Sequence, residues 1–254
     1  MEHASAINSL KPHFRFPLRG DRVTERFLIG SALFLASFII PILPALFVVG
    51  YAVQVMRRAT AGEAPSMHAW QDWGTMLKDG FRAWVISFVF FLPGTVVLLA
   101  GYGAYFASFL ALSTSSGNES DAAFVLPFLL GMASLFLGLG LGSLLFVLAS
   151  IPLPVALAHF AAEDRFAAAF RFRQWWQVLR ANPLGFLIGW VVVVGLMGVV
   201  YFLSLTAYFT LVLICLLPFL LMPASFYVIL VGASLFGDLY AEGKAKAQES
   251  TPSA

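Results

Sequence analysis

Two long stretches of the chain, residues 83–164 and 181–243, contain no lysine or arginine, although the sequence has 15 of these residues in 254. All 15 fall into four short blocks, at residues 1–26, 57–82, 165–180 and 244–246. Long apolar runs bounded by basic blocks are typical of helices that cross a bilayer, and basic residues gather on the cytoplasmic side. The pattern therefore predicts that all four blocks lie on the cytoplasmic side of a cell membrane.

The composition agrees with this interpretation. Sixty per cent of the residues are hydrophobic and only 11% are charged, which excludes a soluble globular protein. A chain in lipid must satisfy its backbone polar groups internally, and apolar runs of this length do so as helices. We expect an all-α, polytopic helical bundle in the cell (inner) membrane. The net charge of +2 and the lack of a basic patch argue against nucleic-acid binding.

The apolar runs divide into about six membrane segments. Residues 27–56 would form a helix of about 45 Å, too long for a hydrocarbon core of about 30 Å. Pro41 and Pro44 favour a break in the middle. We therefore expect a short hairpin of residues 27–40 and 42–56, with one kinked span as the alternative. The remaining predicted spans are residues 81–112, 122–162, 184–203 and 209–236.

The flanking segments complete the predicted organisation. Residues 1–26 form a loosely ordered cytoplasmic tail, residues 27–236 the membrane domain, and residues 237–254 a disordered cytoplasmic tail. The polar loop at residues 113–121 and the turn at residues 204–208 are expected outside. Ser134, Gly138 and Gly142 recur every four residues, a spacing that lets two helices approach closely in lipid. The sequence Ile151-Pro-Leu-Pro154 predicts a helix break.

Two polar interruptions, at residues 65–80 and 165–181, are predicted to be amphipathic helices on the cytoplasmic membrane surface. Pro65 suits the first turn of a helix, and the apolar residues after it recur at spacings of three and four. Tryptophan on the apolar side is typical of a helix at headgroup level. The alternative is that this side packs on the protein's own core. The candidate residues for interfacial or partner contact are Trp70, Trp73, Arg171, Arg173, Trp175 and Trp176.

The two interruptions also share the pattern W-x-x-x-L-[KR]-x-[GN], at Trp73–Gly80 and Trp175–Asn182. Each would stand between an inward and an outward span, which makes two units with the same orientation. The sequence thus indicates a parallel internal repeat of a kind found in some transporters.

Several motifs around the first interruption resemble a prokaryotic integral-membrane family catalogued as domain of unknown function 4013 (DUF4013). They are Gly50-Tyr51 with Arg57-Arg58, Gly62-Glu63 with Pro65, Trp70-Gln-Asp72-Trp73-Gly74 and Asp79-Gly80; the later Phe166–Pro183 stretch is also similar. The resemblance implies a helical bundle in a prokaryotic cell membrane. It implies no catalytic residue.

The side chains needed for catalysis are sparse. The apolar interiors of the predicted spans contain no charged residue, which counts against a proton relay. Cys215 is the single cysteine, and the four histidines are scattered, so no metal site is expected. No nucleophile or phosphate-loop motif is present. We therefore expect no enzyme activity, no catalytic residue and no cofactor.

Two functions follow as hypotheses. The first is a non-catalytic scaffold or accessory protein whose Trp-rich helices contact the lipid bilayer or a membrane or cytoplasmic protein partner. The alternative is a small-solute permease or channel with a pathway between the two repeats. That pathway would be lined by Ser87, Thr95, Tyr102, Ser204 or Tyr227. Neither the partner nor the oligomeric state follows from the sequence.

Overall fold

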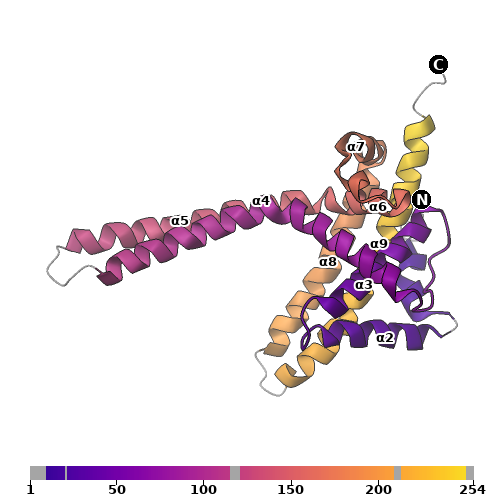
Figure 1. The fold of residues 1–254 in the computed structure, drawn as a ribbon, viewed down its shortest axis with the longest axis horizontal. Coiled ribbons are helices and arrows are strands. Elements are labelled where there is room, and N and C mark those ends of the chain that lie inside the picture. Colours follow the sequence, from indigo (N-terminus) through magenta and orange to yellow (C-terminus); the bar gives the residue numbers. More distant parts are fainter. Residues whose placement is uncertain (1–9, 21, 115–120, 209–212, 250–254) are drawn as a thin grey trace, which may run out of the picture. The chain divides into compact units, whose positions relative to one another are not determined.

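The computed structural model describes residues 10–20, 22–114, 121–208 and 213–249 (Figure 1). This part of the chain is all-α, as predicted, and contains eight α-helices and no strand. It forms two compact units, one of residues 1–86 and 154–254 and the other of residues 87–153. The elements are η1 Phe16–Leu18, α2 Val23–Ala36, α3 Leu43–Thr60, α4 Trp73–Thr114, α5 Asp121–Ser150, α6 Leu153–Glu163, η2 Phe166–Phe170, α7 Phe172–Ala181, α8 Pro183–Tyr208 and α9 Leu213–Glu249.

Within the described residues, four helical stretches are long and apolar enough to cross a membrane, which indicates a multi-pass membrane protein. This is fewer than the six predicted segments. Helix α2 has 14 residues and a length of about 21 Å, short of the hydrocarbon thickness of about 30 Å. Entry of α2 and α3 into the bilayer as a hairpin stays a prediction. The four stretches are Trp73–Ser113, Val125–Glu163, Pro183–Ala207 and Leu216–Glu249.

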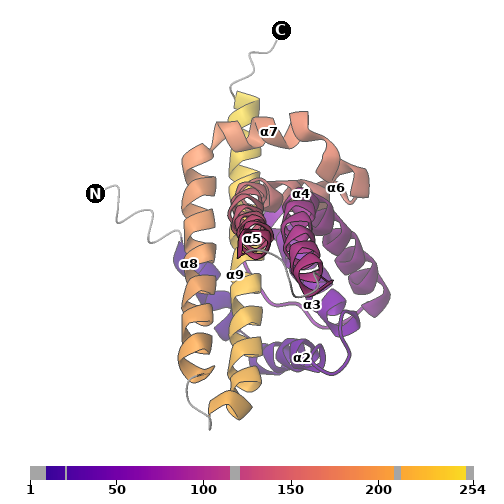
Figure 2. The ribbon, with the colours of Figure 1, turned by 90° about the vertical axis from the view of Figure 1, so that its left-hand side faces the viewer.

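The break predicted within residues 27–56 is present. Helix α2 ends at Ala36 and α3 begins at Leu43, so Pro41 lies between them. Pro44 lies in the first turn of α3, where a missing N–H costs little. The two helices contact each other, and both pack on α9, which runs beside α8 (Figures 1 and 2). Helix α3 supplies much of the buried core of this unit, including Tyr51.

Helices α3 and α4 cross backbone to backbone. A Cβ atom added to Gly80 would lie 1.9 Å from the carbonyl oxygen of Leu46. One added to Gly50 would lie 1.9 Å from the carbonyl oxygen of Met76. No side chain fits in either place, so the crossing depends on glycine at both positions.

In the second unit, residues 87–114 of α4 lie beside α5 (Figure 1). A Cβ atom on Gly138 would lie 2.7 Å from Gly101 Cα, and one on Gly142 would lie 3.2 Å from the carbonyl oxygen of Gly94. The predicted close approach along the small-residue stripe is therefore confirmed. The predicted break is confirmed as well, because α5 ends at Ser150 and α6 begins at Leu153.

The predictions for the chain ends need correction. Helix α9 continues to Glu249, so residues 237–249 are not a disordered tail. Tyr240 is buried there, because it packs against the rest of the unit and contacts His159. At the other end, residues 10–15 are helical, and His13 and Phe16 are buried. The predicted outer loop, residues 113–121, lies largely outside the described residues. The turn predicted at residues 204–208 is wrong, because α8 continues to Tyr208.

Candidate functional site

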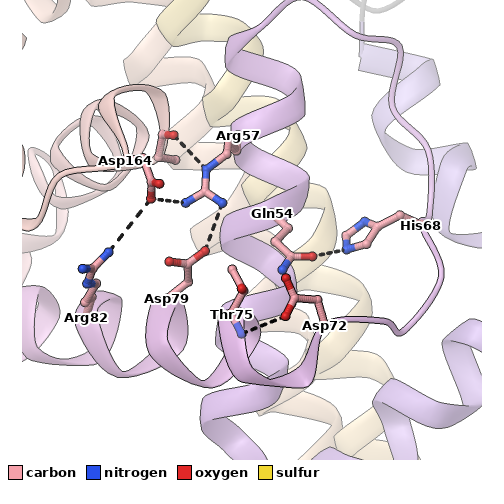
Figure 3. Close-up of polar contacts among 9 residues, drawn as sticks. Gln54, Arg57, His68, Asp72, Thr75, Asp79, Arg82 and Asp164 are labelled. Carbon is pink, nitrogen blue, oxygen red and sulfur yellow. Dashed lines mark hydrogen bonds and ion pairs between the residues drawn. The ribbon is translucent and has the colours of Figure 1, made fainter.

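Residues 63–72 are not helical, so the helix predicted for residues 65–80 is wrong in its first half. Helix α4 begins at Trp73, and the Asp72 carboxylate accepts the Thr75 N–H at 3.4 Å, as a helix cap does (Figure 3). The reason lies in the side chains of His68 and Trp70, whose rings stack on Tyr51 at centroid distances of 4.1 and 4.2 Å. Residues two apart share a face in an extended chain but not in a helix.

His68 is held as a neutral structural residue. Its Nε2–H donates to Gln54 Oε1 at 2.7 Å (Figure 3). Its carbonyl oxygen accepts the Tyr51 hydroxyl at 2.9 Å. Burial lowers the pKa of His68 to about 4, with help from the nearby positive charges of Arg58 and Arg26. At neutral pH the imidazole is therefore uncharged.

Arg57 connects α3, α4 and the end of α6. Its guanidinium lies 3.0 Å from Asp79 Oδ2 and 2.8 Å from Asp164 Oδ1, and its Nε–H donates to the carbonyl oxygen of Ala161 (Figure 3). The Asp79 side chain is only 2% exposed, whereas that of Asp164 is 67% exposed. The contact with Asp79 is an ion pair rather than a well-aligned hydrogen bond. Arg82 approaches Asp164 at 4.0 Å from the next turn of α4.

The burial of Asp79 was not predicted, because this residue lies within residues 65–80, which were expected to form a helix on the membrane surface. A signal was present. Met76, Asp79, Ala83 and Ile86 recur at spacings of three and four, and all four are buried in the structure. A carboxylate inside such a stripe predicts a buried partner of opposite charge.

A second buried polar group centres on His159 of α6. Its Nδ1 accepts the Tyr240 hydroxyl at 2.6 Å, and its Nε2–H donates to Gln174 Oε1 at 3.1 Å. The carboxylate of Glu163 lies 3.5 Å from the same Nε2. These contacts join α6, α7 and α9, so His159 positions α7 within the unit.

A third group places serine, histidine and aspartate in a row. The Ser234 hydroxyl donates to His13 Nδ1 at 2.8 Å, and His13 Nε2 lies 3.3 Å from Asp238 Oδ2. Hydrolytic enzymes use this trio, but their serine must meet a substrate carbonyl. Ser234 is fully buried, with 0% of its surface exposed. The row therefore attaches residues 10–15 to α9 and offers no nucleophile.

Two of the four candidate tryptophans belong to the core. Trp70 donates its indole N–H to the carbonyl oxygen of Arg26 at 2.8 Å, and Trp175 donates to that of Ala169 at 3.0 Å. Trp175 is 2% exposed and Trp70 9%, so neither reaches the surface. The prediction of an interfacial role is wrong for these two. A buried indole with a satisfied N–H is a packing residue.

The other two tryptophans, Trp73 and Trp176, are 42% and 44% exposed. Trp176 lies on α7, where the guanidinium of Arg180 sits over its ring at 5.3 Å from the centroid. Arg173 is exposed on the same helix. Arg171 precedes α7 and is paired with Glu163 at 3.4 Å.

Helix α7 is therefore two-sided. Trp175 and Val178 are buried, while Arg173, Trp176 and Arg180 are exposed at spacings of three and four, which place them on one face. We call these three residues the outer face of α7. The helix runs across the end of α8 rather than along it (Figure 2). The described residues thus bring Arg173 and Trp176 together on a surface, and Trp73 lies on a different element.

Comparison with protein families adds one match. The family model described as "Protein of unknown function (DUF4013)" matches residues 33–209, more than half of the chain. The chain belongs to the DUF4013 family. The matched part contains Arg57, Asp79 and Asp164, whereas α9 of this DUF4013 protein lies beyond it. No curated protein and no solved structure matches the chain.

Proposed function

We propose that this DUF4013 protein is a non-catalytic membrane scaffold or accessory component, and that the outer face of α7 is its contact surface. One observation carries the proposal. Arg173, Trp176 and Arg180 share an exposed face, while the opposite side of the same helix is buried by Trp175 and Val178. Two arginines around an exposed tryptophan suit anionic lipid headgroups or an acidic protein surface at the membrane.

The position of α7 supports this role. The helix ends at Ala181, and α8, a candidate membrane span, begins at Pro183. It also crosses the end of α8 (Figure 2), as a helix in the interfacial plane would. Tryptophan and arginine are the side chains expected at that depth, because each combines an apolar part with a polar group.

Contacts among the basic blocks support a shared cytoplasmic side. Arg57 and Arg82 both approach Asp164, which directly precedes the third block. Lys246 of the fourth block donates to Asn182 Oδ1 at 3.3 Å. Three blocks thus lie at neighbouring sites in one unit, which fits an inner-membrane protein of a prokaryote with both termini in the cytoplasm.

The permease alternative gains no support from the residues predicted to line its pathway. The hydroxyls of Thr95 and Ser204 donate to carbonyl oxygens of their own helices. The hydroxyl of Tyr227 donates to the carbonyl oxygen of Phe14. Ser204 borders a pocket whose other walls are almost entirely apolar. A solute pathway needs polar groups that are turned toward the solute.

The test replaces Arg173, Trp176 and Arg180 together by glutamine. A photo-crosslinking residue at position 177, which is exposed on α7, records contacts with proteins, and mass spectrometry of the purified protein records bound anionic lipid. We expect the triple variant to lose its crosslinked partner or its anionic lipid while keeping its thermal stability. The matched control is Arg165→Gln, an exposed arginine outside α7. Unchanged crosslinks together with unchanged lipid content would refute the proposal.

A further inference from the structure

A pocket of about 370 Å³ lies between residues 10–15, the start of α8 and the C-terminal part of α9. Its polar lining consists of His13, Asn182, Asp238 and Glu242, and its apolar lining includes Leu235 and Leu239. The volume lies in the range of small-ligand sites, which combine apolar walls with a few polar groups. We propose that this pocket binds a primary ammonium group that is attached to an apolar chain.

The polar groups are arranged as acceptors. Asp238 and Glu242 are one turn apart on α9, so they lie on the same face. An ammonium group has three N–H donors and no acceptor, and two carboxylates with one amide oxygen satisfy it. Asn182 provides that amide, and its Nδ2 already contacts Glu242 Oε2 at 3.4 Å.

His13 orients the inner part of the pocket without adding positive charge. Its Nδ1 accepts the Ser234 hydroxyl at 2.8 Å, which leaves Nε2–H to face Asp238 at 3.3 Å. Burial lowers the pKa of His13, so the imidazole stays neutral at physiological pH. The two carboxylates therefore dominate the charge of the lining, which favours a cation.

The chain itself places an ammonium group at the rim. Lys246 Nζ donates to Asn182 Oδ1 at 3.3 Å, and the lysine is exposed. An exposed contact of this kind is weak, so an incoming ammonium group can displace it. Lys246 therefore acts as a competitor, and its removal should strengthen binding.

The pocket lies where α8 begins as a candidate span, so a primary ammonium group attached to apolar chains can come from two sources. One is the ethanolamine headgroup of a phospholipid, and the other is a free amphiphilic amine.

The lipid arm compares phosphatidylethanolamine with phosphatidylcholine of identical acyl chains. Choline keeps the positive charge but has no N–H donor, so a preference for ethanolamine reports hydrogen bonding in the pocket. The full-length protein is reconstituted in an equimolar mixture, and native mass spectrometry gives the ratio of bound lipids. We expect a preference for ethanolamine that Asp238→Asn and Glu242→Gln each reduce roughly tenfold, the usual effect of losing one charged hydrogen bond. We expect Lys246→Met to increase the preference for ethanolamine.

The free-amine arm measures the thermal shift produced by octylammonium against that produced by octyltrimethylammonium. A selective shift by octylammonium that Glu242→Gln abolishes, without any lipid preference, would assign the pocket to free amines. Glu249→Gln, on the same helix but outside the pocket, is the matched control and should change neither signal. Absence of selectivity in both arms would overturn the proposal, as would selectivity that survives both carboxylate substitutions.

Discussion

Replacing Arg57 by methionine should destabilise the protein far more than the same change at the adjacent Arg58. Arg57 is the ion-pair partner of Asp79, whose side chain is 2% exposed. Removing one partner of a buried pair costs about 3–5 kcal/mol, because the remaining charge stays in a poorly solvated place. The contact with the exposed Asp164 adds less than about 1 kcal/mol. We therefore expect Arg57→Met to lower the free energy of unfolding by about 4 kcal/mol.

Arg58 provides the matched control. Its contact with Glu63 measures 4.0 Å, and both side chains are exposed, so Arg58→Met should cost less than about 1 kcal/mol. Thermal unfolding in detergent should show a Tm about 10 °C lower for Arg57→Met than for Arg58→Met. The double variant Arg57→Met with Asp79→Leu should recover most of the loss, because it leaves no buried charge. Equal Tm values for the two arginine variants would refute the reasoning.

Three further predictions concern stability. Gly80→Ala should prevent accumulation of folded protein, because the added Cβ would lie 1.9 Å from the Leu46 carbonyl oxygen. Gly103→Ala should raise Tm slightly, because nothing lies within 4 Å of its added Cβ. Size-exclusion profiles and Tm measurements test both variants. Because the pKa of His68 is low in the folded protein, the unfolded chain binds the proton more tightly. The contribution of His68 to the free energy of unfolding should be complete above about pH 6.5, and up to about 3 kcal/mol of it should be lost as the pH falls to about 4. In unfolding curves recorded between about pH 4 and about pH 6.5, His68→Gln should weaken the dependence of stability on pH. An unchanged dependence would contradict the assignment of this effect to His68. Trp175→Phe should cost about 1 kcal/mol through the lost indole N–H bond to Ala169, and an unchanged Tm would argue against it.

The sequence predicted the features that depend on local chemistry. The break around Pro41 and the break before Pro154 are both present, because proline disrupts the helix at its own position. The close approach at Gly138 was also predictable, because small residues spaced by four let two helices pack closely in lipid. The family resemblance is confirmed as well.

Features that depend on long-range contacts were not predictable in the same way. The spacing of apolar residues around Trp70 fits a helix, but His68 and Trp70 stack on Tyr51 of a different element, and residues 63–72 are not helical. The polar composition after Phe236 suggested disorder, yet Tyr240 is buried against His159 and the helix continues. The sequence predicted an amphipathic helix at residues 165–181 but did not show which of its tryptophans is buried.

The internal repeat stays a prediction. The aligned residues Trp73 and Trp175 differ in environment, since the first is 42% exposed and the second is buried. The first also begins a helix that continues into a candidate span, whereas the helix of the second ends at Ala181. Trp73 and Trp175 therefore match in the sequence but differ in their packing.

The orientation of α7 is the claim on which the proposed function depends, and cysteine labelling measures it. In a Cys215→Ser background, single cysteines are introduced at Gln177, exposed on α7, and at Asn118, in the polar loop predicted to face outward. A membrane-impermeant maleimide applied to intact cells should label position 118 and leave position 177 unlabelled until the membrane is opened. Labelling of position 177 from outside, with position 118 protected, would contradict the account.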